Sequence, residues 1–130
     1  MKIMIDTNVL ISAVYNQNSL PAKAVRTACE NHELLLCDHI INECYDVVNR
    51  KFPQHIPVMD KLLSTMVYET VIAPRDPGSL IADPKDAPIL NAAILHGVDV
   101  IISGDKHFLE LDMEHPKTLN VADFLGIYGE

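Results

Sequence analysis

The chain has 130 residues, a length that favours one domain with one hydrophobic core. Hydrophobic residues make up 48% and charged residues 22%, which is an ordinary globular composition. No apolar run approaches the roughly 18 residues of a membrane span, and the start, MKIMIDTN, is too short and too acidic for a signal peptide. We therefore expect a single cytoplasmic domain over residues 1–130 with no membrane partner.

Cysteine usage and net charge further restrict the kinds of site and ligand that we expect. Three cysteines without a CxxC spacing argue against a disulfide framework, so we expect buried, reduced thiols. A zinc site of Cys37, His39 and Cys44 would lack the paired spacing of structural zinc motifs. The formal net charge of −8 argues against tight, sequence-independent binding to nucleic acid. Metal bound to clustered acids would neutralise part of that charge.

Short apolar runs alternate with helical patterns along the whole chain. In chain order, the expected elements are a strand at 2–5, a helix at 8–15, a helix at 21–31, a strand at 34–37, a helix at 38–51, a helix at 57–67, a strand at 69–73, a loop at 74–84, a helix at 87–97, a strand at 98–103 and a strand at 118–121. Gly97 stands where a helix C-cap glycine is expected. The alternation predicts an α/β fold with a mostly parallel sheet that is covered on both faces.

Four acidic residues stand at the ends of apolar runs. Asp6 and Asp105 follow expected strands, Glu43 lies at the margin of the buried stripe of the 38–51 helix, and Asp86 opens the helix at 87–97. Sites in open α/β sheets form beyond the carboxyl ends of the strands, so Asp6 and Asp105 face each other if the first and fourth strands are neighbours. Converging carboxylates raise each other's pKa, and Mg2+ or Mn2+ relieves that repulsion.

Ordinary structural roles compete with this interpretation at the first two acids. Asp6 is a good helix N-cap, although Thr7 and Asn8 could cap the same helix and leave Asp6 for other work. Glu43 could be a surface residue paired with Asn42 or Arg50 of its own helix. Of the four acids, Glu43 is the least suited to capping.

The acids in the second half of the chain have similar alternatives. Asp86 could complement a helix dipole, and Asp83 could cap the same helix or extend an acid cluster. Asp105 follows Ser-Gly and could serve a turn. Lys106 and His107 could be ordinary surface residues, or they could contact phosphates at the rim of a site.

Four blocks of sequence together resemble the PIN-domain family. They are DTNVLISA after the first strand, NEC on a helix, DPKDAPILNAA at a helix start and SGDKHFL after a strand. Their order within about 130 residues is specific, and the likeness runs from about residue 2 to residue 125. It is strongest to the VapC-like PIN-family toxins of prokaryotic toxin–antitoxin systems.

The resemblance implies a three-layer α/β/α sandwich and a metal-dependent endoribonuclease. The residues that it implies as catalytic and as ligands of Mg2+ or Mn2+ are Asp6, Glu43, Asp86 and Asp105. The residues that it places beside the site are Thr7, Asn8, Asp83 and Ser103. The first candidates for RNA contacts are Lys106 and His107, ahead of Lys23, Arg26, Arg50 and Lys51. An antitoxin partner and a homodimer are further expectations from the family, and transfer, ribosomal and messenger RNA all remain open as substrates.

Other functions are compatible with parts of the pattern. A haloacid-dehalogenase-type, Mg2+-dependent phosphotransferase also begins with an Asp at a strand exit, but it needs a second Asp at the position of Asn8. A receiver domain needs an acidic pair at the first strand and a phospho-acceptor Asp in mid-chain, and neither pattern appears. A non-catalytic PIN-fold module for dimerisation and partner capture is a third alternative, which the intact acidic quartet disfavours.

Overall fold

The computed structural model describes residues 1–74, 87–111 and 113–129. In this part of the chain, five strands form one sheet in the order β3-β2-β1-β4-β5, and every neighbouring pair is parallel. The strands are β1 (Lys2–Ile5), β2 (Glu33–Cys37), β3 (Glu69–Val71), β4 (Val100–Ile102) and β5 (Lys117–Leu119). The expected adjacency of the first and fourth strands is confirmed, because β1 pairs with β4.

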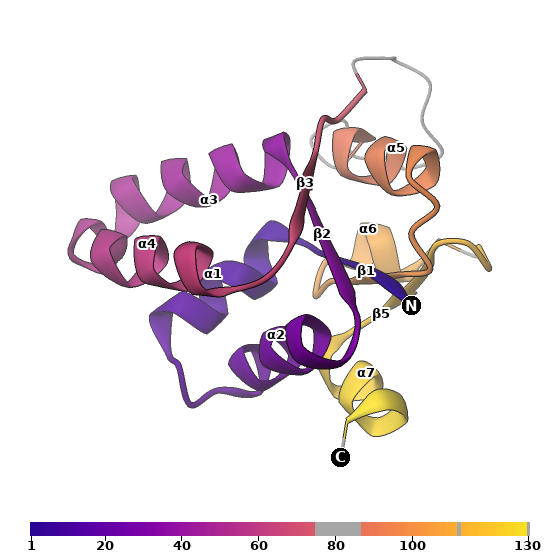
Figure 1. Cartoon of the computed structure of the whole chain (residues 1–130), viewed down its shortest axis with the longest axis horizontal. Coiled ribbons are helices and arrows are strands. Elements are labelled where there is room, and N and C mark those ends of the chain that lie inside the picture. Colours follow the sequence, from indigo (N-terminus) through magenta and orange to yellow (C-terminus); the bar gives the residue numbers. More distant parts are fainter. Residues whose placement is uncertain (75–86, 112, 130) are drawn as a thin grey trace.

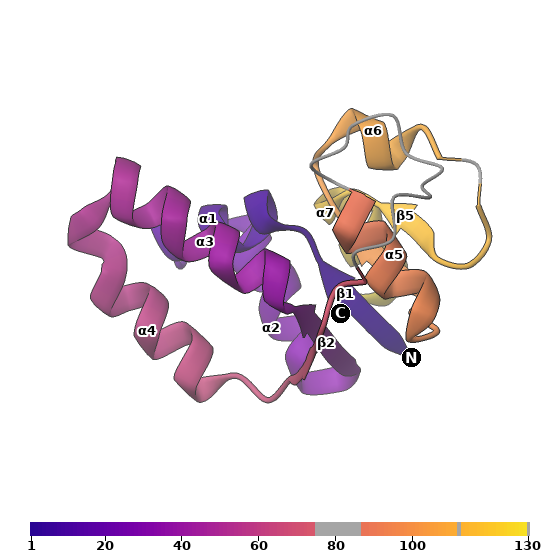
Figure 2. The same cartoon turned by 90° about the horizontal axis from the view of Figure 1, so that it is seen from above.

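Helices connect the strands and cover both faces of the sheet (Figures 1 and 2). They are α1 (Thr7–Tyr15), α2 (Leu20–Asn31), α3 (Asp38–Lys51), the 3-10 helix η1 (Pro53–His55), α4 (Ile56–Thr65), α5 (Ala87–Leu95), α6 (Lys106–Leu109) and α7 (Val121–Tyr128). The predicted three-layer α/β/α sandwich around a parallel sheet is confirmed. Within the described ranges, no helix combines the length and apolar character that crossing a membrane requires.

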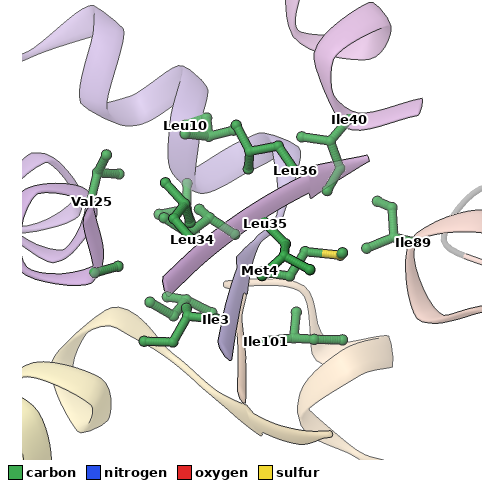
Figure 3. Packing of buried hydrophobic residues seen from close by; sticks show 14 of the residues in the cluster. Ile3, Met4, Leu10, Val25, Leu34, Leu35, Leu36, Ile40, Ile89 and Ile101 are labelled. Atoms are coloured by element: carbon green, nitrogen blue, oxygen red, sulfur yellow. The ribbon is translucent and has the colours of Figure 1, made fainter. Parts of the chain in front are cut away.

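The core lies on both sides of the central strands, because successive strand residues point to opposite faces. Leu34 packs on the side of Leu10 and Val25, whereas Leu35 faces Ile89 on the other side (Figure 3). All five of these side chains are buried. A strand covered on both faces must be apolar at every position, which explains the continuous runs in the sequence.

Three predicted strands are shorter than expected. The strand expected at 69–73 ends at Val71, the strand expected at 98–103 covers Val100–Ile102, and the strand expected at 118–121 ends at Leu119. Asn120 then caps α7, because its side-chain oxygen accepts a hydrogen bond of 2.7 Å from the Asp123 amide. A helix was not predicted after the last strand, and its signal is the spacing of apolar residues that pack on the core: Val121, Phe124, Leu125 and Tyr128.

The end of the α5 region agrees with the prediction. Gly97 adopts φ +67°, a conformation that residues with a Cβ rarely take, and it ends the helical turn after α5. The chain then enters β4 directly, with Val98 buried. The predicted loop at 74–84 lies outside the described residues from position 75 onward.

Replacing a buried residue of β4 tests this account of the core. Ile101 is fully buried in the strand beside β1, so Ile101→Ala should lower the free energy of unfolding by about 2–5 kcal/mol. Leu95→Ala is the control, since Leu95 is 65% exposed and should cost less than about 0.5 kcal/mol. Urea denaturation measures both, and equal losses would contradict the assignment of the core.

Candidate active site

The carboxyl ends of β1 and β4 bring distant parts of the sequence together. Ile5 pairs with Ile102, and the Asp6 amide extends the ladder with a 2.9 Å hydrogen bond to the Ile102 carbonyl. The next side chains along the two strands therefore meet, and the Ser103 hydroxyl donates to Asp6 Oδ2 at 2.9 Å. The parallel register fixes this contact between residues that lie 97 positions apart.

Asp6 serves a helix and the site at once. It is the N-cap of α1, where its Oδ1 accepts a 2.8 Å hydrogen bond from the Thr7 amide. Its other oxygen is held by Ser103, and the residue is only 3% exposed. The idea that Thr7 or Asn8 would cap this helix in its place is wrong, because the backbone of Asp6 leaves β1 in the extended conformation of an N-cap.

Asp105 is joined to Asp6 through a single hydroxyl group. The Asp105 amide donates to Ser103 Oγ at 2.9 Å, and Asp105 Oδ1 accepts from the His107 amide at 2.8 Å as the N-cap of α6. Ser103 is fully buried, and its hydroxyl group links the side chain of Asp6 to the backbone of Asp105. The turn expected at Ser-Gly-Asp is therefore also a structural bridge.

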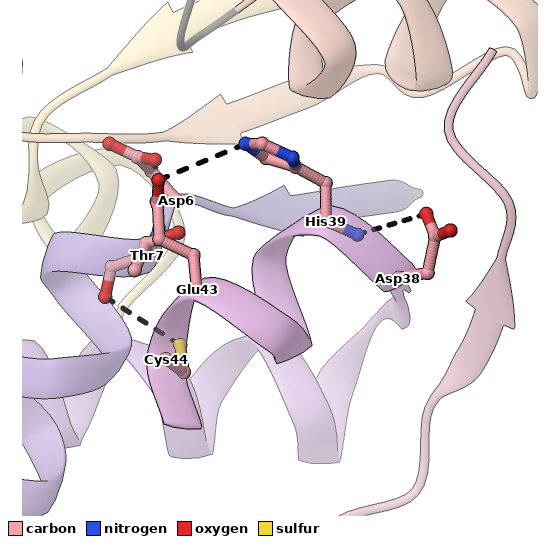
Figure 4. A network of polar contacts seen from close by, with 6 residues as sticks. All are labelled: Asp6, Thr7, Asp38, His39, Glu43 and Cys44. Carbon is pink, nitrogen blue, oxygen red and sulfur yellow. Dashed lines mark hydrogen bonds and ion pairs between the residues drawn. The ribbon is translucent and has the colours of Figure 1, made fainter. Parts of the chain in front are cut away.

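Glu43 reaches the same region from α3. Its side chain is 33% exposed, in keeping with the predicted position at the margin of the buried stripe. The neighbouring Cys44 thiol points to the Thr7 carbonyl at a 4.0 Å S···O distance, which ties this turn of α3 to the start of α1 (Figure 4). The expected partners within its own helix were Asn42 and Arg50, but the structure records His39, whose Nε2 lies 3.8 Å from Glu43 Oε2.

The three carboxylates influence one another electrostatically. Burial raises the pKa of Asp6 from 3.8 to about 6, while hydrogen bonds from Ser103 and the Thr7 amide lower it. The negative charges of Glu43 and Asp105 raise this pKa further. Asp6 is thus a carboxylate for which a nearby cation would relieve both the burial and the repulsion.

The donor chemistry fits a hard divalent cation. Within the described ranges, no group of three or more His, Cys, Asp or Glu side chains is arranged closely enough to enclose an ion. Asp83 and Asp86, which are predicted site residues, lie outside the described residues. Carboxylate oxygens from Asp6, Glu43 and Asp105 nevertheless make a donor set suited to Mg2+ or Mn2+.

An unsatisfied hydroxyl lies next to these acids. Thr7 is 2% exposed, and its Oγ1 is buried without a hydrogen-bond partner in the described structure. Leaving such a group unpaired costs about 1–3 kcal/mol, and a native protein usually satisfies it with water or an ion. Thr7 Oγ1 is thus a group that a water or an ion could satisfy, and its predicted place beside a metal stays a prediction.

The cysteines do not build a metal site. Cys37 and Cys44 are buried and unpaired, as predicted, whereas Cys29 is half-buried. Burial raises the pKa of Cys37 to about 11, and burial also raises the pKa of Cys44. Both thiols therefore stay protonated at neutral pH in the metal-free protein.

Two of the predicted RNA-contact residues directly follow Asp105 in the chain. Lys106 is exposed at the start of α6, and His107 Nδ1 lies 3.3 Å from Asp105 Oδ1. Arg26 donates instead to the Gln17 carbonyl at 3.1 Å, between α1 and α2. His39 was not predicted as a neighbour of the site. Its spacing could have indicated the contact, because it precedes Glu43 by four residues on the same helix.

Asp6→Asn should stabilise the metal-free protein at neutral pH. Because its pKa rises from 3.8 in the unfolded chain to about 6 in the fold, the folded state holds more protons between these values, and the free energy of unfolding falls as pH rises from about 4 to about 6. The loss is on the order of 3 kcal/mol and is absent in the variant.

Urea denaturation in EDTA between pH 4 and pH 8 measures this effect. The stability difference between Asp6→Asn and the parent should grow with pH and level off above about 6. Asp46→Asn, on the exposed side of α3, serves as the control. A difference that does not change with pH would contradict the burial of the Asp6 charge.

Comparisons with known proteins identify the fold and the family of this chain. The structure is similar to that of VapBC2 from Rickettsia felis, solved bound to a DNA fragment from their promoter, with a TM-score of 0.70 and 16% sequence identity over 92% of this chain and 98% of the other. A comparison with curated proteins gives no match. Residues 2–107 match the sequence profile of the PIN domain, and the chain therefore belongs to the PIN-domain family.

Proposed function

We propose that this protein is a divalent-metal-dependent endoribonuclease and the toxin component of a toxin–antitoxin system. The observation that carries the nuclease proposal is the buried Asp6 carboxylate, whose pKa is raised by burial and by the charges of Glu43 and Asp105. These acids come from the ends of two strands and from a helix, so their approach is a product of the fold. Membership of the PIN-domain family supports the same activity.

Four acids would share the metal. Asp6, Glu43 and Asp105 would hold Mg2+ or Mn2+, with Asp86 as a ligand that binds directly or through water. When bound, the ion supplies Lewis acidity toward the scissile phosphate and lowers the pKa of a bound water.

The remaining residues orient the acids and receive the substrate. Ser103 holds Asp6 by its hydroxyl group and Asp105 by its backbone, so it sets the separation of these two ligands. Thr7 and Asn8 lie in the first turn of α1, directly after Asp6. Lys106 is exposed on α6 beside Asp105 and, with His107, is the first candidate to contact RNA phosphates.

Asp6→Asn should abolish metal-dependent RNA cleavage while the fold is retained. The amide removes the buried negative charge, and losing several kcal/mol of metal-supplied stabilisation corresponds to a rate at least about 100-fold lower. Single-turnover cleavage of a labelled RNA in Mn2+ measures this rate, with Asp46→Asn as the control. EDTA should stop the parent enzyme. Cleavage by Asp6→Asn at the parent's rate would refute the assignment.

A non-catalytic PIN module is the principal alternative. Such a module would use the fold for homodimerisation and partner capture, and its acids would be structural. Isothermal titration with Mn2+ separates the two functions, because a pure scaffold should show no binding that depends on Glu43 and Asp105. The homodimer itself is a proposal that light scattering coupled to gel filtration tests.

A hollow between helices supports a protein partner. It has a volume of about 670 Å3 and lies away from the carboxylates. Its apolar lining comes from α1, α2, α4 and the segment after α4: Ala13, Val14, Val25, Leu62, Met66 and Val67. Cys29 also lines the hollow, and its thiol donates a hydrogen bond to the Val67 carbonyl and accepts one from the Val67 amide. Arg26 and Lys61 also line the hollow and would suit acidic residues flanking an apolar helix. We propose that an antitoxin segment of this kind binds here.

Val67→Asp should weaken antitoxin binding by about tenfold or more. Val67 is 78% exposed, so the fold tolerates the change, but a carboxylate in an apolar contact costs well over 1 kcal/mol. Leu95→Asp is the control, because Leu95 is 65% exposed on α5 and does not line the hollow. Titration with the protein encoded by the adjacent gene gives the affinities. Equal binding by both variants would place the partner elsewhere.

A further inference from the structure

Glu43 is held differently from the other two acids of the site. Asp6 and Asp105 each follow a strand, and each is fixed by hydrogen bonds that involve Ser103 and a backbone amide. Glu43 projects from the middle of α3 on a longer side chain, which has more rotamers to lose when it is ordered. In the described part of the chain, the partner recorded for its carboxylate is His39.

His39 stands on a well-anchored turn. Its amide donates to Asp38 Oδ1 at 2.9 Å, and the same oxygen accepts from the Ala73 amide at 2.8 Å. Asp38 therefore ties the first turn of α3 to the segment after β3. The imidazole of His39 points to Glu43, which lies one turn further along α3, and His39 Nε2 is 3.8 Å from Glu43 Oε2. This contact is on the side of the helix that faces Asp6 (Figure 4).

We propose that His39 is a positioning residue that directs the Glu43 carboxylate toward the shared metal site. This inference rests on the proposed metal-dependent function. His39 restricts the rotamers of Glu43 from a neighbouring turn, so the carboxylate is in place before an ion arrives. Partners of this kind, which orient a ligand without binding the metal, typically change metal affinity by about 10–100-fold when they are removed.

The ordinary alternative is that His39 and Glu43 form a pair on the helix surface that does not affect metal affinity. Exposed pairs at this spacing contribute little to stability. The chain contains a matched comparison. His115 Nδ1 lies 3.8 Å from Asp99 Oδ1, the same separation, but Asp99 precedes β4 at the opposite end of the strand from Ser103. If the loss of any histidine–carboxylate pair lowered metal affinity, removing His115 should therefore lower it as much as removing His39.

Mn2+ titration of the full chain by calorimetry tests the inference. His39→Ala should raise the Kd by about 10–100-fold, and His39→Gln should recover most of the affinity because its polar amide reaches toward Glu43 across the same turn. His115→Ala should bind as the parent does. In a Glu43→Gln background, His39→Ala should cause no further loss, since its target is already absent. Thermal unfolding in EDTA verifies that each variant is folded.

Three outcomes would overturn the inference, and they are distinguishable. If Glu43→Gln loses Mn2+ affinity but His39→Ala binds as tightly as the parent, His39 has no positioning role and the proposed function stands. If Glu43→Gln itself binds Mn2+ as the parent does, the proposed metal site is wrong and the inference falls with it. An equal loss in His39→Ala and His115→Ala would also contradict it, because the effect would then be unrelated to the site.

Discussion

A carboxylate is buried at the exit of the central strand, where its charge constrains everything around it. Burying the charge of Asp6 is unfavourable, and Ser103 and the Thr7 amide offset only part of that cost, since the pKa still rises to about 6. The fold tolerates this because the strand that ends at Asp6 is covered on both faces by apolar side chains. The core stabilises the fold, whereas the buried charge of Asp6 at the edge of the sheet would be stabilised by a cation.

The strand order determines which residues meet at that edge of the sheet. With β1 and β4 adjacent and parallel, whatever follows each strand must meet its counterpart, and here those residues are Asp6 and Ser103. Ser103 is a small hydroxyl residue that can donate to one acid and accept from the backbone of the next. An apolar residue at this position would leave Asp6 Oδ2 and the Asp105 amide without their partner, and the burial of both groups would become more costly.

The sequence was sufficient for features that follow from periodicity and from strand order. Continuous apolar runs predicted a sheet covered on both faces, and acids at strand exits predicted that Asp6 and Asp105 would approach. Three adjacent residues able to cap α1 could not be ranked, because the choice depends on where the backbone leaves β1. The helix after β5 was missed because its first residue, Val121, also continues the apolar pattern of the strand. His39 was considered only as a zinc ligand, and its contact with Glu43 required the side-chain geometry of α3.

The net charge of −8 limits how such a site could work on RNA. Charges separated by more than about 8–10 Å are largely screened at physiological salt, so the total charge repels a substrate weakly at a distance and most strongly near the acid cluster. A divalent cation bound by Asp6, Glu43 and Asp105 would offset two of their three negative charges and so weaken the repulsion of a phosphate at this point. The exposed Lys106 lies on the same side, next to Asp105 in the chain. Affinity would then come from short-range contacts at one phosphate and not from a broad basic surface, which favours a restricted set of substrates over indiscriminate cleavage.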